Sequence, residues 1–272
     1  MSLSKKIDFA IIISVRNANP NGDPLNGNRP RTTYDSYGEI TDVCIKRKIR
    51  NRLLDAGEAI LVQSDDYRTD EHQSIKARYD AAMVYMSKEK DVGERAKAAC
   101  ELWLDVRAFG QVLAGVDDVS ASISIRGPVS IQSAFSIEQV DVTSLQITKS
   151  VNLKTNEKNP SEKSGDTMGL KHRVDQGVYV TYGSINRQLA GITGFTDDDA
   201  EKIKQAMTCL FDNDESSARP AGSMEVVKVI WWTHSEATLS SASVHRSLCV
   251  SPDGSYVITP LTGITVEEIS GH

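Results

Sequence analysis

Basic and amide side chains gather near the start of the chain, in an order suited to binding an anionic polymer. Residues 16–24 read RNANPNGDP, and the Asn-Pro, Asn-Gly and Asp-Pro pairs favour tight turns with exposed backbone N–H groups. Such groups form concavities that bind anions, including phosphate. Residues 46–52 then supply five Lys or Arg side chains. Together the two stretches predict a phosphate-binding surface.

The segment before this turn is predicted to be a strand. Apolar residues occupy the odd positions from Ile7 to Val15, whereas Asp8, Ser14 and Arg16 occupy even positions. One face of the strand should therefore pack in the core, and the other should be available for binding.

A helix is predicted to carry the basic run. It begins at Thr41 or Asp42, both good N-cap residues, and ends at Gly57, a good residue just beyond a C-cap. Apolar residues at positions 45, 49 and 53 share one face, so most of the basic residues are expected elsewhere. A charge run usually means a solvated face, but the adjoining turn shifts the interpretation toward nucleic acid.

Composition limits the class of protein. The chain has 272 residues and a net charge of −6, which argues against a surface that coats nucleic acid everywhere but permits a basic groove. This length favours one core with insertions. The four cysteines are far apart, with no Cys-x-x-Cys pair, which predicts reduced thiols and neither metal nor cofactor. No apolar run approaches the ~20 residues of a membrane helix, so a cytoplasmic protein without membrane contact is expected.

Later segments predict both helices and strands. Residues 59–100 are polar and helix-forming, which indicates an inserted helical subdomain, while residues 103–110 fit either a strand or a helix end. Residues 122–137 alternate again and predict a long strand bent at Gly127-Pro128, with Arg126, Gln132 and Ser136 opposite the apolar face. Residues 148–176 are polar and predict a long loop or projecting hairpin.

The order of these elements predicts the fold class. Residues 178–183 and 224–233 should be strands, a capping box of Thr196 and Asp199 should start a helix between them, and residues 256–269 should close the sheet. This is the order of an α+β, RRM-like or ferredoxin-like split βαβ sheet. Its first and third strands lie together, which would place the polar face of residues 122–136 beside that of the first strand.

Aromatic residues make up only 6% of the chain. An RRM that reads bases stacks them on aromatic side chains of the two central strands. The predicted polar faces instead favour contacts with phosphate and sugar, which are independent of base sequence. Bound RNA would keep its bases free to pair, as a guide-RNA scaffold requires.

Four stretches resemble a known family. Residues 17–24, 41–51, 126–129 and 167–172 read NANPNGDP, TDVCIKRKIRN, RGPV and TMGLKH. Together they closely resemble the backbone subunit of the type I-C CRISPR interference complex, Cascade, which belongs to the RAMP superfamily. The resemblance runs through nearly the whole chain in order, and its first two motifs are long and specific.

The resemblance implies a single RRM-like domain of residues 1–272, with an antiparallel-sheet palm, a helical finger insertion at 57–100 and a thumb hairpin at 146–176. Copies would stack along one CRISPR RNA, contact other Cascade subunits and present the guide's bases to target DNA. RNA-binding residues are expected at Arg16, Asn17, Asn19, Asn21, Lys46, Arg47, Arg50, Arg126, Gln132 and Ser136. Thumb contacts are expected at Lys149, Met168, Lys171 and His172.

Two alternatives remain open beside this non-enzymatic scaffold. One is a CRISPR RNA-processing endoribonuclease of the same superfamily, which needs a positioned acid and base. His172, between Lys171 and Arg173, is the candidate for that chemistry. The other is a general single-strand-binding protein, which would stack bases on aromatic side chains along its groove.

Overall fold

An antiparallel sheet organises the structure, a computed structural model that describes residues 2–84, 91–114, 122–148, 168–235 and 239–272. Among these residues the main sheet has the strand order β14-β11-β1-β10-β8-β4, and β7 and β9 also pair with β10. The strands are β1 (Ile7–Ala18), β4 (Tyr37–Ile40), β7 (Val129–Ile131), β8 (Ala134–Gln139), β9 (Val142–Thr148), β10 (Met168–Ile185), β11 (Met224–His234) and β14 (Ile264–Ser270).

The central strands confirm the predicted fold class. Helix α1 (Asp42–Asp55) follows β1, and α6 (Asp197–Thr208) joins β10 to β11, so β11, β1, β10 and β8 lie in the order of a split βαβ sheet. The predicted neighbour of β1 is wrong, however. Strand β10 lies beside β1, with Ile11 opposite Thr181, whereas β7 and β8 lie beyond it. Residues 104–109 form a helix, so residues 129–139 supply the second core strand instead of the third.

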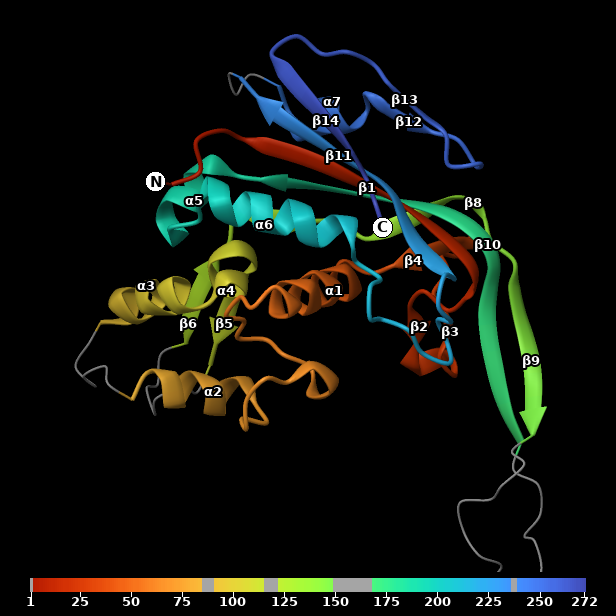
Figure 1. Cartoon of the computed structure of the whole chain (residues 1–272), viewed down its shortest axis with the longest axis horizontal. Helices are drawn as coiled ribbons and strands as arrows, with labels where there is room; N and C mark the ends of the chain where they lie inside the picture. The colour runs from red at the N-terminus through yellow and green to blue at the C-terminus, as the bar shows by residue number, and fades with distance from the viewer. Residues whose placement is uncertain (1, 85–90, 115–121, 149–167, 236–238) are drawn as a thin grey trace, which may run out of the picture.

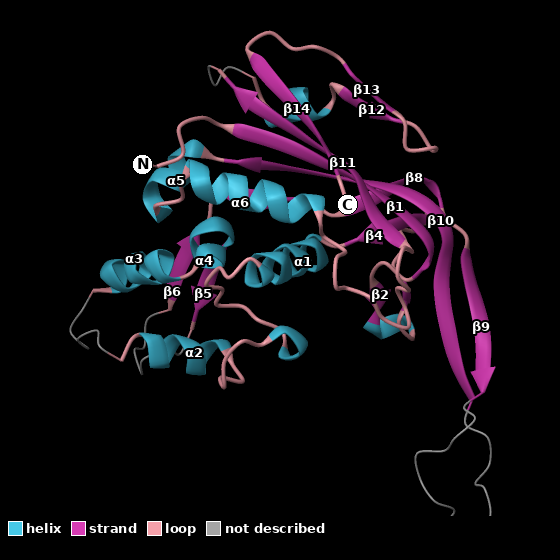
Figure 2. Cartoon of the chain, in the orientation of Figure 1, coloured by secondary structure: helices cyan, strands magenta, loops and turns pink. Residues whose placement is uncertain are grey.

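Both faces of the sheet are covered. Helices α1, α5 (Arg187–Thr193) and α6 lie on one face, and α7 (Ser241–His245), β12 (Leu248–Val250) and β13 (Tyr256–Ile258) lie over the other (Figures 1 and 2). The alternation predicted that the even positions of β1 would be available for binding, which is wrong for the first half of the strand, whereas Arg16 near its end is exposed. Asp8, Ala10 and Ile12 are fully buried, and the latter two pack with Trp232, Val244 and other residues of this second face.

The two core helices start where their sequences predict. Thr41 caps α1 by accepting a hydrogen bond from Cys44 N, and Gly57 beyond its end has a φ of +81°. Thr196 and Asp199 form the capping box of α6. Apolar residues of both helices, and Leu210 just after α6, pack in the main core and are buried: Ile45, Ile49, Leu53, Ala200, Ile203, Met207 and Leu210.

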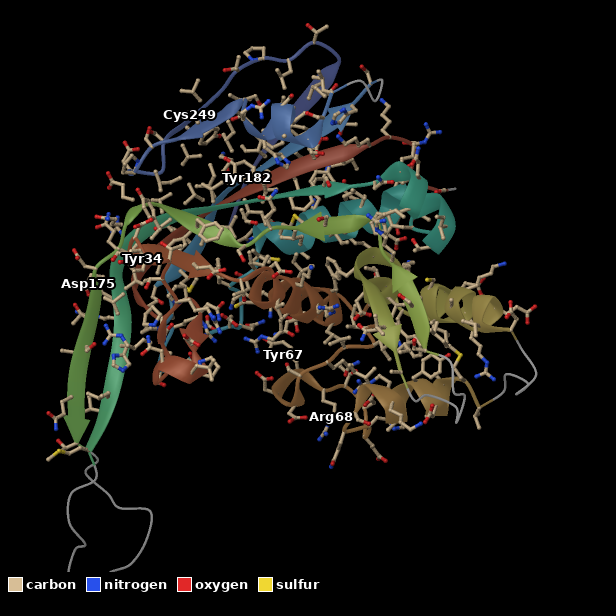
Figure 3. All side chains as sticks on the ribbon, turned by 180° about the vertical axis from the view of Figure 1, so that it is seen from behind. Tyr34, Tyr67, Arg68, Asp175, Tyr182 and Cys249 are labelled. Atoms are coloured by element: carbon tan, nitrogen blue, oxygen red, sulfur yellow. The ribbon has the colours of Figure 1, made fainter. Side chains whose placement is uncertain are left out.

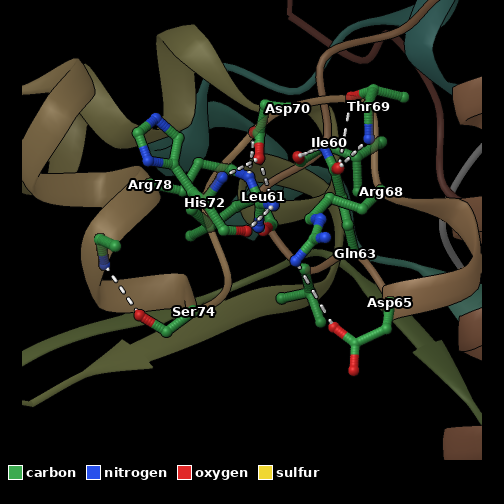
Figure 4. A network of polar contacts seen from close by, with 12 residues as sticks. Ile60, Leu61, Gln63, Asp65, Arg68, Thr69, Asp70, His72, Ser74 and Arg78 are labelled. Carbon is green, nitrogen blue, oxygen red and sulfur yellow. Dashed lines mark hydrogen bonds and ion pairs between the residues drawn. The ribbon is translucent and has the colours of Figure 1, made fainter.

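A second hydrophobic cluster lies beyond α1. It draws side chains from α2 (Ile75–Ala82), α3 (Val92–Leu102), α4 (Leu104–Phe109), β5 (Gly110–Leu113) and β6 (Ile123–Arg126). Figure 4 shows how the loop before α2 is held: Arg78 is buried, bonds Asp70 through Nε and Nη2, and donates to the carbonyls of Leu61 and His72. The division into palm, finger and thumb remains a prediction, but this cluster forms a small core of its own among the described residues between 61 and 125.

Strands β9 and β10 form a hairpin that projects from the sheet (Figure 1). Asp175 lies where the hairpin leaves the sheet (Figure 3) and accepts hydrogen bonds from Thr143 Oγ1 and Arg173 Nε. The hydrogen bond from Thr143 contributes most to holding the pKa of Asp175 below its usual value, and that from Arg173 adds to it. Leu145, Ile147, Met168 and Leu170 are 43–67% exposed on the hairpin. Lys149, predicted as a thumb residue, lies outside the described residues.

Candidate nucleic-acid interface

A cavity of about 430 Å³ opens between the hairpin and the turn that follows β1. Three separate stretches of chain line it: the end of β1 with the turn after η1 (Pro24–Asn26), the β9–β10 hairpin, and the loop after α6. The lining residues are Asn19, Gly27, Asn28, Ile147, Leu170, Lys171, His172, Ser217 and Ala218. The fold thus brings Asn19, which the sequence predicted as an RNA contact, together with Lys171 and His172, which it predicted as thumb residues far along the chain.

The side chain of Asn19 is fixed by its neighbours. Its backbone N–H donates to Ala218 O at 2.9 Å, and its Nδ2 donates to Asn28 O at 2.7 Å. The residue is only 3% exposed, and its Oδ1 has no hydrogen-bond partner among the described residues. Asn28 and Gly27 both have positive φ values, of 60° and 57°, which suits Asn and Gly in a tight turn. The predicted turn chemistry therefore builds one wall of the cavity.

His172 is held by a short chain of hydrogen bonds. Arg29, in β3 (Arg29–Pro30), donates from Nη1 to Ser144 Oγ at 2.9 Å, and Ser144 Oγ lies 2.9 Å from His172 Nδ1. Because the hydroxyl accepts from Arg29, its own proton is placed to bond Nδ1, which favours the tautomer with a proton on Nε2. The chain ties the hairpin to the β2–β3 ribbon, where β2 is Gly22–Asp23.

Arg16 and Asn17 lie close to the base of the hairpin. Both are exposed, and Arg16 lies opposite Gln176 of β10 while its backbone N–H donates to Ser223 O. The guanidinium of Arg16 makes no ion pair with another described residue, and the same holds for Lys171 of the cavity. These two cations are therefore available to a phosphate. Asn21 instead positions α1, because its Oδ1 accepts from both the backbone N–H and the hydroxyl of Thr41.

The basic residues of α1, predicted to form one wall of an RNA groove, are largely paired with acidic residues. Lys48 is 1% exposed and paired with Asp214, and burial lowers its pKa although Asp214 opposes the shift. Arg50 pairs with the buried carboxylate of Asp105 at 2.9 Å.

The remaining basic residues of α1 are partly used as well. Lys46 pairs with Asp42, and Arg52 donates to Tyr67 OH at 2.8 Å. Arg47 is half-buried. The pKa of Asp66 is lowered mainly by a hydrogen bond with the Ser64 side chain, and the positive charge of Arg47 nearby lowers it further. Lys46 and Arg47 keep partial exposure toward solvent, so they remain predictions for RNA contact, whereas Arg50 has a structural partner.

Three predicted residues lie away from the cavity. Arg126 is exposed on β6, which packs in the second hydrophobic cluster and not beside Arg16. Gln132 is also exposed. Its backbone N–H donates to Tyr182 O, and its carbonyl accepts from the Thr181 hydroxyl. Ser136 is 5% exposed, because its hydroxyl accepts from Gly38 N and donates to Glu138 O, and so joins β4 to β8. The small polar face predicted for residues 122–136 is therefore not a continuous binding surface.

Sequence reasoning missed Arg29, Asn28 and Ser217. Arg29 and Asn28 lie only a few residues beyond the predicted turn of residues 16–24. A turn predicted to extend to residue 29 would have included both. Ser217 carries no local signal, because only the contact of the 216–219 loop with Asn19 brings it to the cavity.

The sequence matches the family model of CRISPR-associated protein Cas7 over residues 5–261. The chain belongs to the Cas7 family. It is 25% identical over 236 residues to a CRISPR-associated protein Cas7 of Haloferax volcanii, covering 82% of this chain and 68% of that one. Among solved structures, it is similar to a chain of a CRISPR RNA-guided surveillance complex in a pre-nicking state, with a TM-score of 0.54 and 16% identity over 88% of this chain and 81% of that chain. That similarity supports the Cas7 fold.

Within the described parts of the chain, no group of three or more His, Cys, Asp or Glu could hold a metal ion. All four cysteines are free thiols. No described helix is both long and apolar enough to cross a membrane.

Proposed function

We propose that this Cas7 chain is the backbone subunit of a type I-C Cascade complex. Several copies bind along one CRISPR RNA through phosphate and sugar contacts and leave its bases free to pair with target DNA. The subunit acts as a scaffold with other Cascade subunits in the cytoplasm and has no catalytic role of its own. The observation that carries this proposal is the convergence of Asn19, Lys171 and His172 on one cavity.

The chemistry of that cavity suits an RNA backbone. Lys171 supplies a cation, Asn19 and Asn28 supply amide groups, and Ser217 supplies a hydroxyl. None of its described lining residues is Phe, Tyr or Trp, which are the side chains that stack bases in a general single-strand-binding groove. Backbone contacts give affinity and register without reading sequence. This is why the scaffold is favoured over the general single-strand binder.

Charge reversal at the cavity tests the proposal. Lys171→Glu and Arg16→Glu should weaken binding of the purified full chain to single-stranded RNA by the same factor for several unrelated sequences. The matched control is Lys97→Glu on α3, whose side chain is 79% exposed and far along the chain from the cavity. Fluorescence anisotropy with labelled RNAs measures the affinity. Losses confined to one RNA sequence, or equal losses in the control, would contradict backbone binding.

Assembly is tested by size-exclusion chromatography of the chain with and without guide RNA. The scaffold predicts large species that contain both protein and RNA. A monomer that never elutes with RNA would refute it.

The endoribonuclease alternative depends on His172. This residue is 8% exposed and its Nδ1 is hydrogen-bonded to Ser144, so only Nε2 is left to exchange a proton with a substrate. Wild-type protein and His172→Gln should leave a labelled guide precursor equally intact. Cleavage by the wild type that the variant loses would establish the nuclease instead.

A further inference from the structure

The loop that follows α6 carries one wall of the cavity. Residues 216–219 form a tight turn closed by two backbone hydrogen bonds, of 2.8 and 3.1 Å, between its first and last residues. Ser217 and Ala218, between them, line the cavity. Residues 212–223 are all described and belong to no helix or strand. The position of this loop must therefore come from its contacts with other elements.

The 212–223 loop supplies acceptors to the end of β1. The backbone N–H of Asn19 donates to Ala218 O at 2.9 Å, and that of Arg16 donates to Ser223 O at 2.7 Å. Asn19 lines the cavity, and Arg16 is exposed near the base of the hairpin. The loop thus fixes the backbone of two residues that were predicted as RNA contacts, in addition to forming part of the wall.

A buried lysine of α1 anchors this loop. Lys48 is 1% exposed, so its side chain cannot touch RNA in the folded chain, and its ammonium pairs with the carboxylate of Asp214. The same carboxylate accepts from Arg219 Nε at 2.8 Å. One acidic side chain therefore joins the helix to both ends of the segment 214–219, which contains the tight turn.

A second contact ties the loop to the segment between α1 and α2. Tyr67, in η2 (Asp65–Tyr67), donates its hydroxyl to Asn213 O at 2.6 Å and accepts from Arg52 Nη2 at 2.8 Å. Asn213 has a φ of +53°, a left-handed backbone that Asn adopts more readily than most residues. Lys48 and Arg52 are four positions apart and so share one face of α1, which is the face that holds the loop.

We propose that Lys48 positions the cavity without touching RNA, by holding the 212–223 loop through Asp214. The loop in turn keeps the backbones of Arg16 and Asn19 where RNA meets them. The inference rests on the proposed RNA-binding function and adds to it a positioning residue. Removing an ammonium from water is costly, so a buried ion pair adds little net stability, and the contribution of this pair is to geometry.

Two variants each remove one anchor and keep the packing. Lys48→Met retains an unbranched side chain that can pack on Phe211, whose ring centroid lies 5.1 Å from the ammonium, and it leaves Asp214 paired with Arg219. Tyr67→Phe removes only the hydroxyl that bonds the loop. The matched control is Asp70→Asn, which weakens an ion pair with a buried arginine outside the cavity lining.

Hydrogen–deuterium exchange of the RNA-free chain, under conditions in which every variant is folded, reads the loop directly. Lys48→Met should speed exchange about tenfold in peptides that contain residues 16–19 and 212–223, as loss of one charge-assisted hydrogen bond predicts, and leave α3 unchanged. Tyr67→Phe should speed it less in the same peptides. Fluorescence anisotropy with a single-stranded RNA should show affinity lowered about threefold to tenfold by Lys48→Met and unchanged by Asp70→Asn.

Each outcome decides the proposal. Wild-type exchange at residues 16–19 and 212–223 in Lys48→Met overturns the positioning role. Wild-type RNA affinity in that variant, or an equal loss in Asp70→Asn, also overturns it while the RNA-binding function stands. Wild-type protein that binds no RNA refutes the proposed function and the inference with it. If Lys48→Met fails to fold, Tyr67→Phe decides by the same two measurements.

Discussion

Removal of the Asp105 carboxylate should destabilise the protein strongly, because this buried group serves three donors. Its side chain is 1% exposed. Oδ1 accepts from Leu61 N at 2.8 Å, and Oδ2 accepts from Val62 N at 3.1 Å and from Arg50 Nε at 2.9 Å. Asp105→Ala would leave the guanidinium of Arg50, which is 13% exposed, and two backbone amides without their acceptor.

The size of the effect follows from these contacts. Removing one partner of a buried ion pair costs about 3–5 kcal/mol of the free energy of unfolding. Asp105→Asn keeps one neutral acceptor of the same size, so we expect a loss of about 1.5–3 kcal/mol. The control is Glu101→Ala, because this carboxylate is 67% exposed and lies 3.9 Å from Lys97. An exposed pair of this kind contributes about 0–1 kcal/mol.

Urea unfolding of the RNA-free chain, followed by tryptophan fluorescence, measures these differences. Trp103 belongs to the same hydrophobic cluster as Leu61 and therefore reports on the region that Asp105 holds. A loss below about 1 kcal/mol for Asp105→Ala would refute the account. Arg50 would then be free enough to contact RNA, as its sequence position had suggested.

Two further predictions concern the cavity and the second face of the sheet. Lys171→Ala should reduce the slope of log binding constant against log salt concentration by about 0.7, the value for one contact with a single-stranded phosphate, as measured by titration at several salt concentrations. His245 stacks on Tyr182 and contacts Gly183 O, and burial lowers its pKa although Asp8 opposes the shift. The folded protein therefore binds this proton less well than the unfolded chain, and stability should fall as the pH drops below about 6.5. His245→Phe should show a smaller fall in melting temperature between neutral and mildly acidic pH, and an unchanged fall would contradict this assignment.

The fold could be predicted because its signals are local. The cap at Thr41, the capping box of Thr196 and Asp199 and the period-two strands depend on residues that are neighbours in sequence. Helix and strand order then left few topologies. The second face of β1 could not be predicted in the same way, because its cover comes from residues 241–258. Ala10 and Ile12, both fully buried on that face, were the local signs that it was not polar throughout.

The candidate site was predicted only in part, because a run of basic residues in the sequence does not show which of them are neutralised by acidic residues in the fold. Helical spacing places Lys48 and Arg50 away from the apolar stripe, but it cannot show that Asp214 and Asp105 arrive from distant parts of the chain to pair with them. Asn19, which the family resemblance predicted as an RNA contact, lies just beyond β1, where Asn28 and Ala218 accept its hydrogen bonds. Its role in RNA binding stays a prediction.

The pairing of the α1 basic residues also explains how an acidic chain can offer a site for RNA. The net charge of the chain is −6, but some of its carboxylates are paired inside the fold. Asp214 pairs with Lys48 and Asp105 pairs with Arg50, so these cations are not available to RNA. Lys171 and Arg16 make no such pairs with described residues. Arg16 lies opposite Gln176 near the base of the hairpin, and Lys171 lies farther along the hairpin, opposite Leu145. Attraction between exposed charges is screened beyond ~10 Å at moderate salt, so the cations nearest the phosphate decide binding more than the distant acids do. A net charge computed over the whole chain is therefore a poor guide to this surface, and the placement of Lys171 beside Asn19 is a better one.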